Sequence, residues 1–187
     1  MKRFAMLMIV VLFAAPVALA DWAIDEGFEG GAIPAGWTVV GGGDSDDWFA
    51  YNNAAYAYTG EWVAAVAAYS SSGAGNDWLI TPQVALSVGD VFGFYARSWY
   101  GTEDFEVWLS TTGNSPGDFG VMLGSATVGD SYVGYEYDLS AYAGQSCYLA
   151  IVWFYNDYAL LVDDVRVGQE ASPVEDASWT AIKAMYK

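Results

Sequence analysis

The sequence of 187 residues contains no histidine, and this absence excludes several kinds of chemistry. Ser-His-Asp and Cys-His catalysis, histidine-based zinc sites and proton transfer by imidazole all need the missing side chain. Carboxylate chemistry of the glycosidase type remains as the enzymatic alternative, because the chain has 23 Asp and Glu residues. No convergent pair can be singled out among so many, which include Asp104, Glu106, Glu136 and Asp138.

Cysteine and basic residues are also scarce. Cys147 is the only cysteine, so no disulfide can form within the chain, and its apolar neighbours predict a buried, unreactive thiol. Because only six Lys and Arg residues oppose 23 Asp and Glu residues, the chain has a net charge of −17 at pH 7. Such a charge opposes binding to DNA, RNA or anionic membranes, which select basic surfaces, and it favours cations as partners.

Long apolar runs are missing except at the start of the chain. Basic residues precede the apolar segment 4–15, and the small residues Ala18 and Ala20 form a signal-peptidase pattern. The run is too short for a stable membrane span, which needs about 20 apolar residues. We therefore predict a signal peptide over residues 1–20, no transmembrane segment, and a secreted or cell-surface location.

The rest of the sequence predicts β-strands separated by turns. Clusters rich in Gly, Asp and Ser at 41–47, 70–76 and 111–118 favour turns. Many short strands at this spacing indicate an all-β sandwich. The predicted strands are 23–29, 37–40, 48–51, 62–68, 77–81, 91–97, 105–110, 121–128, 133–139, 147–154 and 160–167.

The end of the chain differs in composition from the strands. Residues 169–177 are polar, and apolar residues then recur at three-residue spacing, namely Trp179, Ile182 and Met185. This spacing predicts a short helix with one apolar stripe. We interpret 21–168 as one domain and 169–187 as a linker and tail, which either docks as an ordinary terminus or serves as a sorting or attachment signal.

One carboxylate lies within an apolar strand. Strict alternation along 159–167 places Asp163 on one face with three apolar residues that seek a core, Leu161, Val165 and Val167. An unpaired buried charge is costly, and the chain has few bases to pair with it. A bound cation is therefore the expected compensation.

Five segments in order resemble the cleaved adhesin domain family and its relatives, the choice-of-anchor J domains. They are Phe28-Glu29, Ile33-Pro-Ala-Gly-Trp37, Gly75-Asn-Asp-Trp-Leu-Ile-Thr-Pro82, Asp104-Phe-Glu-Val-Trp-Leu-Ser110 and Val162-Asp-Asp-Val165. The resemblance extends over about 23–168. It implies a jelly-roll β-sandwich of two antiparallel sheets, bacterial secretion or surface display, structural calcium, and adhesion to an extracellular glycan or protein.

The resemblance places calcium near the ends of the first and last strands. Glu29 and Asp163 are the first candidate ligands, and Asp164 and Glu26 follow. Calcium takes about six to eight oxygen ligands, which carboxylates and loop carbonyls can supply. Strict alternation points Glu29 away from the side of Phe28, so a bulge would be needed to turn it toward the site.

A second acidic cluster lies in a glycine-rich loop. Its spacing is that of a calcium-binding loop, although the full twelve-residue hand pattern is absent. The alternative is a loop whose charges are solvated. The candidate residues are Asp44, Asp46 and Asp47.

Aromatic residues in or near loops are the candidates for ligand binding. Trp99 and Tyr100, at the end of a predicted strand, come first, because exposed rings surrounded by polar groups suit sugar recognition. The other candidates are Tyr51, Tyr56 and Tyr58. The alternative for each is ordinary packing, since the chain has 9 Trp, 14 Tyr and 9 Phe residues to bury.

Together these observations predict a secreted, non-catalytic module for adhesion or for binding carbohydrate or protein, braced by structural calcium. One alternative is a structural cell-surface component displayed through its C-terminal tail. The other is a carboxylate-based glycoside hydrolase.

Overall fold

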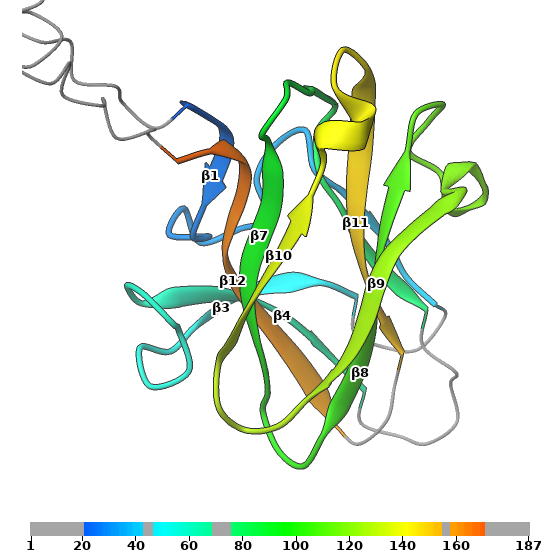
Figure 1. Ribbon diagram of the computed structural model, residues 1–187. Helices are drawn as coiled ribbons and strands as arrows, with labels where there is room; N and C mark the ends of the chain where they lie inside the picture. Colours follow the sequence, from blue (N-terminus) through cyan, green and yellow to red (C-terminus); the bar gives the residue numbers. More distant parts are fainter. Residues whose placement is uncertain (1–20, 43–46, 69–75, 155–157, 171–187) are drawn as a thin grey trace, which may run out of the picture. The chain divides into compact units, whose positions relative to one another are not determined.

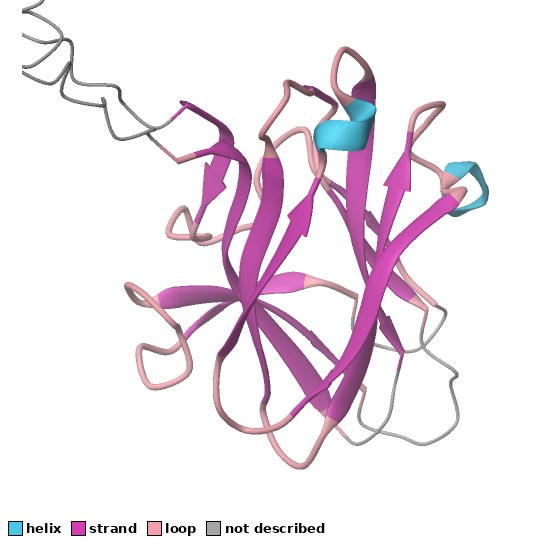
Figure 2. Ribbon diagram, in the orientation of Figure 1, coloured by secondary structure: helices cyan, strands magenta, loops and turns pink. Residues whose placement is uncertain are grey.

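The computed structural model describes residues 21–42, 47–68, 76–154 and 158–170, which form β-strands joined by turns and two short 3-10 helices, as Figure 2 shows. The 3-10 helices are η1 (Pro116–Asp118) and η2 (Ser140–Tyr142). The strands are β1 (Asp21–Glu26), β2 (Thr38–Val40), β3 (Phe49–Asn52), β4 (Trp62–Ala67), β5 (Asp77–Ile80), β6 (Val84–Ala85), β7 (Val91–Ser98), β8 (Glu103–Ser110), β9 (Val121–Val128), β10 (Val133–Asp138), β11 (Ser146–Phe154) and β12 (Ala159–Gln169).

All the predicted strands are present, and their ends lie within three residues of the predicted ends. Alternation of buried and exposed side chains is a local property, so it locates strands well. Only β6 has no counterpart in the prediction, because two residues are too few to show a period.

The strands form two antiparallel sheets (Figure 1). Sheet A has the order β10-β7-β12-β4-β3, and β1 also pairs with β12. Sheet B has the order β2-β5-β11-β8-β9, and β6 also pairs with β11. The predicted all-β jelly-roll sandwich is confirmed.

Alternating residues of both sheets fill the core. Along β7 the buried positions include Phe92 and Phe94, and along β8 they include Phe105 and Val107. The rings of Phe94 and Phe105 lie 5.6 Å apart between centroids and join the two layers. Cys147 is buried in the same core, as predicted, and burial raises the pKa of its thiol.

Strand β12 changes partner halfway along its length. One edge pairs with β7, whereas the other pairs with β4 through residues 159–162 and with β1 through residues 165–169. The register shifts between Asp163 and Arg166, and Asp164 has a positive φ of 48°. These features define a β-bulge at Asp163 and Asp164.

The bulge corrects one sequence prediction. Leu160, Val162, Val165 and Val167 all belong to the core between the sheets, whereas Leu161 packs in a separate cluster. The prediction that Leu161, Asp163, Val165 and Val167 share one face is therefore wrong, because the extra residue inverts the alternation. Asp163 is buried, as predicted, but on the outer face of sheet A with Leu161.

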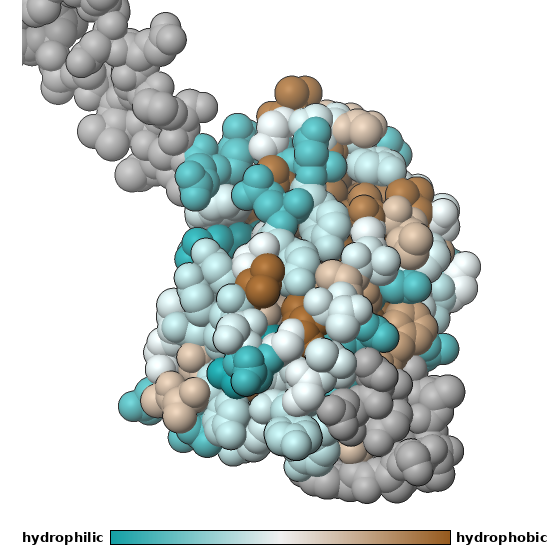
Figure 3. Space-filling view, turned by 60° about the horizontal axis from the view of Figure 1, so that its bottom comes forward, coloured by the Kyte–Doolittle hydropathy of each residue, from teal (hydrophilic) through white to brown (hydrophobic). Residues whose placement is uncertain are grey.

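Several predictions concern residues outside the described ranges. They are the signal peptide over 1–20, the tail beyond residue 170, and Asp44 and Asp46 of the acidic loop. In the described part of the chain, no helix is long and apolar enough to cross a membrane. The face seen in Figure 3 is mostly hydrophilic, with small groups of apolar residues between polar ones.

Gly168 tests the pairing of β12 with β1. Its φ is 138°, and a Cβ there would lie 2.2 Å from the carbonyl oxygen of Asp21. We expect Gly168→Ala to destabilise the fold by about 2–4 kcal/mol, because the backbone of β1 must move. Urea unfolding measures this change.

The matched control is Gly129→Ala, since no atom lies within 4 Å of a Cβ at that position. It should change stability by less than about 1 kcal/mol. Equal stability of the two variants would show that β1 does not pair closely with β12.

Candidate functional site

Four predicted metal ligands lie where β12 changes partner, in a region that we call the bulge site. It contains the bulge of β12, the turn that follows β1 and the end of the loop that precedes β4. These segments come together because β4 and β1 share one edge of β12 and leave the bulge between them. The residues of the bulge site are Glu26, Gly27, Glu29, Thr59, Asp163 and Asp164.

A turn directs Glu29 toward the loop before β4. Strand β1 ends at Glu26, and Phe28 has a φ of 61° and is fully buried, with its ring 5.8 Å from that of Trp37. Glu29 Oε1 then accepts hydrogen bonds of 2.9 Å from the backbone amides of Glu61 and Trp62. The predicted strand thus ended three residues too late, and the turn reorients Glu29 without a bulge.

Backbone amides surround the buried carboxylate of Asp163. Its Oδ2 accepts hydrogen bonds from the amides of Tyr58, at 2.8 Å, and Thr59, at 3.2 Å, and its Oδ1 accepts one of 2.7 Å from Asp164. These bonds compensate much of the desolvation, so the charge does not depend on a base or a cation alone. Burial still raises the pKa of Asp163 to about 6, against the effect of the amide bonds.

Two carboxylates face the space above Gly27. A Cβ at Gly27 would lie 3.4 Å from Asp164 Oδ1 and 3.8 Å from Asp163 Oδ1. The hydroxyl of Thr59 donates a hydrogen bond of 2.7 Å to Asp164 Oδ1, and the carboxylate of Glu26 accepts one of 2.5 Å from the amide of Phe28. The donor set consists of oxygen alone, which suits a hard cation such as calcium.

Acidic side chains alone do not complete a metal site. Within the described ranges, no three acidic side chains converge as a metal cluster. Carbonyl and hydroxyl oxygens would have to supply the remaining ligands. In the second predicted cluster, Asp47 is exposed and its carboxylate lies against Gly41.

Three of the five predicted ligand-binding aromatics pack against one another on the outer face of sheet A. The ring of Trp99 lies 4.9 Å from that of Tyr51 and 4.5 Å from that of Tyr56. They cover buried apolar residues of β4 and β12, Val63, Ala65 and Leu161. Much of their ring surface is therefore used in packing, which was the alternative reading.

The other two aromatics keep exposed rings. Tyr58 stacks on Tyr95 with centroids 3.7 Å apart and is 42% exposed, and Tyr100 is 71% exposed. Sequence reasoning missed Arg97, which lies over the ring of Tyr56, and Tyr132, whose hydroxyl donates to the carbonyl of Tyr56. No local pattern marks these residues, because strand pairing and a loop bring them together.

The fold defines the chain as a β-sandwich of two antiparallel sheets. A model of the Cleaved Adhesin Domain family matches residues 22–148. The chain belongs to this family, as its sequence motifs predicted.

Hemagglutinin A from Porphyromonas gingivalis is 29% identical to this chain over 184 residues, or 81% of the chain. The chain spans only 7% of the length of that relative. Among solved structures, the K3 cleaved adhesin domain of Lys-gingipain from P. gingivalis matches with a TM-score of 0.68 and 21% identity, covering 80% of this chain and 100% of that one.

The same fold occurs in a xylan-binding domain. The CBM22-1 xylan-binding domain of Paenibacillus barcinonensis Xyn10C matches with a TM-score of 0.56 and 18% identity, covering 84% of this chain and 100% of that one. At this identity the likeness shows the fold alone.

Titration of Asp163 should make the metal-free protein less stable as the pH rises. Its folded pKa of about 6 exceeds the ordinary value of 3.8, so the folded state binds the proton more tightly than the unfolded chain does. The resulting stabilisation is complete below the ordinary pKa and is lost as the pH passes the folded pKa. It amounts to about 2–3 kcal/mol.

Urea unfolding in EDTA at about pH 4 and about pH 7 measures this loss. The Asp163→Asn variant has no carboxyl group to protonate at this position. Its free energy of unfolding should therefore lack this pH-dependent contribution, whatever the absolute stability of the variant. The exposed acid Asp130 provides the control, because Asp130→Asn should keep the pH dependence of the parent. The same pH dependence in the parent and Asp163→Asn would contradict the assignment.

Proposed function

We propose that this protein is a secreted or surface-displayed, non-catalytic adhesion module that binds an extracellular glycan or protein. Its membership of the cleaved adhesin domain family carries the proposal. The fold it shares with a xylan-binding domain supports a glycan as one kind of partner. The excess of acidic residues disfavours nucleic acid and anionic membranes.

Structural calcium at the bulge site is the second part of the proposal. The two carboxylate oxygens that face Gly27 support it, as does the oxygen-only donor set. Asp163 and Asp164 would hold the cation, with Glu29, Glu26 and the hydroxyl of Thr59 beside them. A cation there would reduce the repulsion between the adjacent carboxylates and would tie β12 to the turn after β1.

The two alternatives have less support. Display through the C-terminal tail depends on residues outside the described ranges. Hydrolysis needs carboxylates on either side of a scissile bond, whereas Asp104 and Glu106 lie on one face of one strand. A binding module without turnover therefore agrees best with the observations.

Calcium should raise the melting temperature of the purified chain. At a free concentration of about 100 times the dissociation constant, a ligand of the folded state adds about 2.7 kcal/mol. This corresponds to about 5–10 °C for a domain of this size. Thermal unfolding in calcium and in EDTA measures the difference, and Asp164→Asn should lose most of it.

Asp164→Asn is the sharper variant, because the amide can still accept the hydrogen bond of Thr59 while the charge is removed. Asp130→Asn should respond to calcium as the parent does. An equal melting temperature of the parent in calcium and EDTA would refute structural calcium.

Binding should occur without turnover. The purified chain, immobilised on beads, should retain at least one member of a panel of extracellular polysaccharides and matrix proteins. No reducing ends should be released from the polysaccharides, since the proposed site binds without catalysis. Reducing ends that increase with protein concentration would identify a hydrolase, and failure to retain any member of the panel would contradict the adhesive role.

A further inference from the structure

The outer face of sheet B carries aromatic side chains around small buried ones. Along β11, Ala150 and Val152 point away from the core between the sheets and form a separate apolar cluster. Partly exposed rings from three strands surround them, namely Trp78, Trp108, Tyr148 and Phe154. The small buried residues leave the surrounding aromatic rings partly accessible on this surface.

Strand pairing places polar groups next to these rings. Phe154 of β11 pairs with Asp104 of β8, which pairs with Thr127 of β9. In the neighbouring row, Glu106 pairs with Ser125. Because residues two apart along a strand share a face, Asp104 and Glu106 lie side by side on the outer surface.

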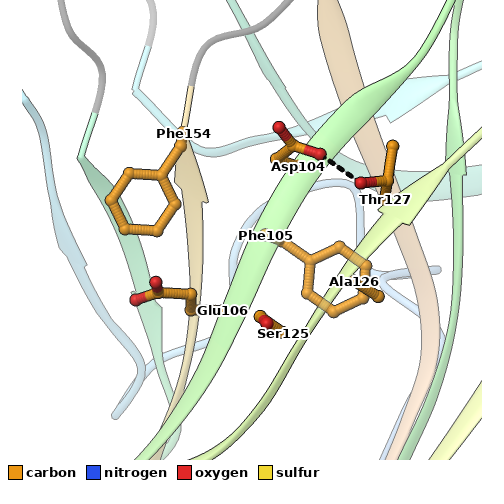
Figure 4. A pocket seen from close by; sticks show the side chains of 7 residues that line it. All are labelled: Asp104, Phe105, Glu106, Ser125, Ala126, Thr127 and Phe154. Carbon is orange, nitrogen blue, oxygen red and sulfur yellow. Dashed lines mark hydrogen bonds between the residues drawn. The ribbon is translucent and has the colours of Figure 1, made fainter.

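These side chains line a cavity of about 490 Å³. Figure 4 shows how the side chains of its lining lie. The volume of the cavity lies within the range of ligand sites, which is about 300–1,000 Å³. Its lining comes from β8, β9 and the end of β11, and consists of Asp104, Phe105, Glu106, Ser125, Ala126, Thr127 and Phe154.

Hydrogen bonds orient both carboxylates of the cavity. Asp104 accepts a hydrogen bond from the hydroxyl of Thr127 (Figure 4), and Glu106 Oε2 accepts one of 2.8 Å from the indole nitrogen of Trp108. Each bond uses one carboxylate oxygen, so Asp104 Oδ2 and Glu106 Oε1 remain available to accept a hydrogen bond. Trp108 is held in turn by its bond to Glu106.

The chemistry of the lining selects a neutral ligand rich in hydroxyls. Ionised carboxylates only accept hydrogen bonds, and sugar hydroxyls can donate to them. No basic residue is among the seven that line the cavity, and the chain carries a net charge of −17, so an anionic ligand would be repelled. The apolar face of a pyranose ring can stack on an aromatic side chain such as Phe154.

We propose that the cavity on the outer face of sheet B binds neutral pyranose residues of an extracellular glycan. Asp104 and Glu106 accept hydrogen bonds from the sugar hydroxyls, and the ring of Phe154 provides a stacking surface. This inference rests on the proposed function, which it deepens by assigning a ligand class and a site.

The outer face of sheet A is less suited to this role. There Tyr51, Tyr56 and Trp99 pack against one another, and Tyr58 packs against Tyr95. Tyr100 is the most exposed ring of the predicted group and lies in the turn between β7 and β8, so it represents the competing predicted site in the test.

Affinity gel electrophoresis of the purified chain tests the proposal, with gels that contain xylan, galactan or anionic polygalacturonate. The parent should be retarded by at least one neutral polysaccharide and less by polygalacturonate. Ser125→Trp should weaken retardation by about tenfold or more, because it fills the cavity from an exposed position without removing a packed side chain. Phe154→Ala should weaken it similarly, and Glu106→Gln should weaken it several-fold.

The control is Val88→Ala, since Val88 is an exposed apolar residue that does not line the cavity. It should bind as the parent does, and thermal unfolding should show that all variants fold. If a neutral polysaccharide retards Ser125→Trp as strongly as the parent, the proposed site on sheet B is wrong, while the adhesive function still stands. Loss of binding in Tyr100→Ala with retention in Ser125→Trp would place the sugar at the turn between β7 and β8.

Two further outcomes would also overturn the proposal. If no neutral polysaccharide retards the parent, neutral glycans are excluded as the ligand class. The adhesive function would then depend on which polysaccharides or matrix proteins the immobilised chain retains in the bead experiment. Binding of oligolysine in place of the saccharides would show that the carboxylates recognise a cationic peptide.

Discussion

The buried carboxylate of Asp163 holds together three parts of sheet A. Its hydrogen bonds to the amides of Tyr58 and Thr59 attach the loop before β4 to β12, and its bond to Asp164 stabilises the bulge. The bulge lets both halves of β12 bury apolar residues in the core while β4 and β1 share one edge. Because an uncompensated buried charge would be costly, these segments must keep their places around Asp163.

The two sheets have different outer faces, and the attached loop covers part of the face of sheet A. On sheet A it brings Tyr56 onto Trp99 and Tyr58 onto Tyr95, so aromatic surface is consumed in packing. On sheet B, residues of three adjacent strands line a cavity, and they include the carboxylates of Asp104 and Glu106 and the ring of Phe154. One sandwich therefore combines an outer face of packed aromatic rings on sheet A with a cavity lined by carboxylates on sheet B.

Sequence reasoning named acidic residues that the fold brings close together, but the reason it gave was incomplete. Glu29 and Asp163 lie in the bulge site, yet Glu29 is placed by a turn at Phe28, and Asp163 is compensated by amides of a distant loop. Gly27 and Thr59 were missed, because their importance depends on contacts across the fold. The bond between Thr59 and Asp164 joins residues 105 positions apart, and no local pattern reveals it.

The sequence by itself determined the strands, the buried state of Cys147, and the family. These properties follow from local alternation, turn residues and short motifs, which the fold does not need to rearrange. Only the tertiary structure decided that Asp163 faces outward from sheet A, that Trp99 packs with Tyr51 and Tyr56, and that Asp104 and Glu106 line a cavity. Strand order and the bulge of β12 set these positions, and both depend on pairing between segments far apart in the chain.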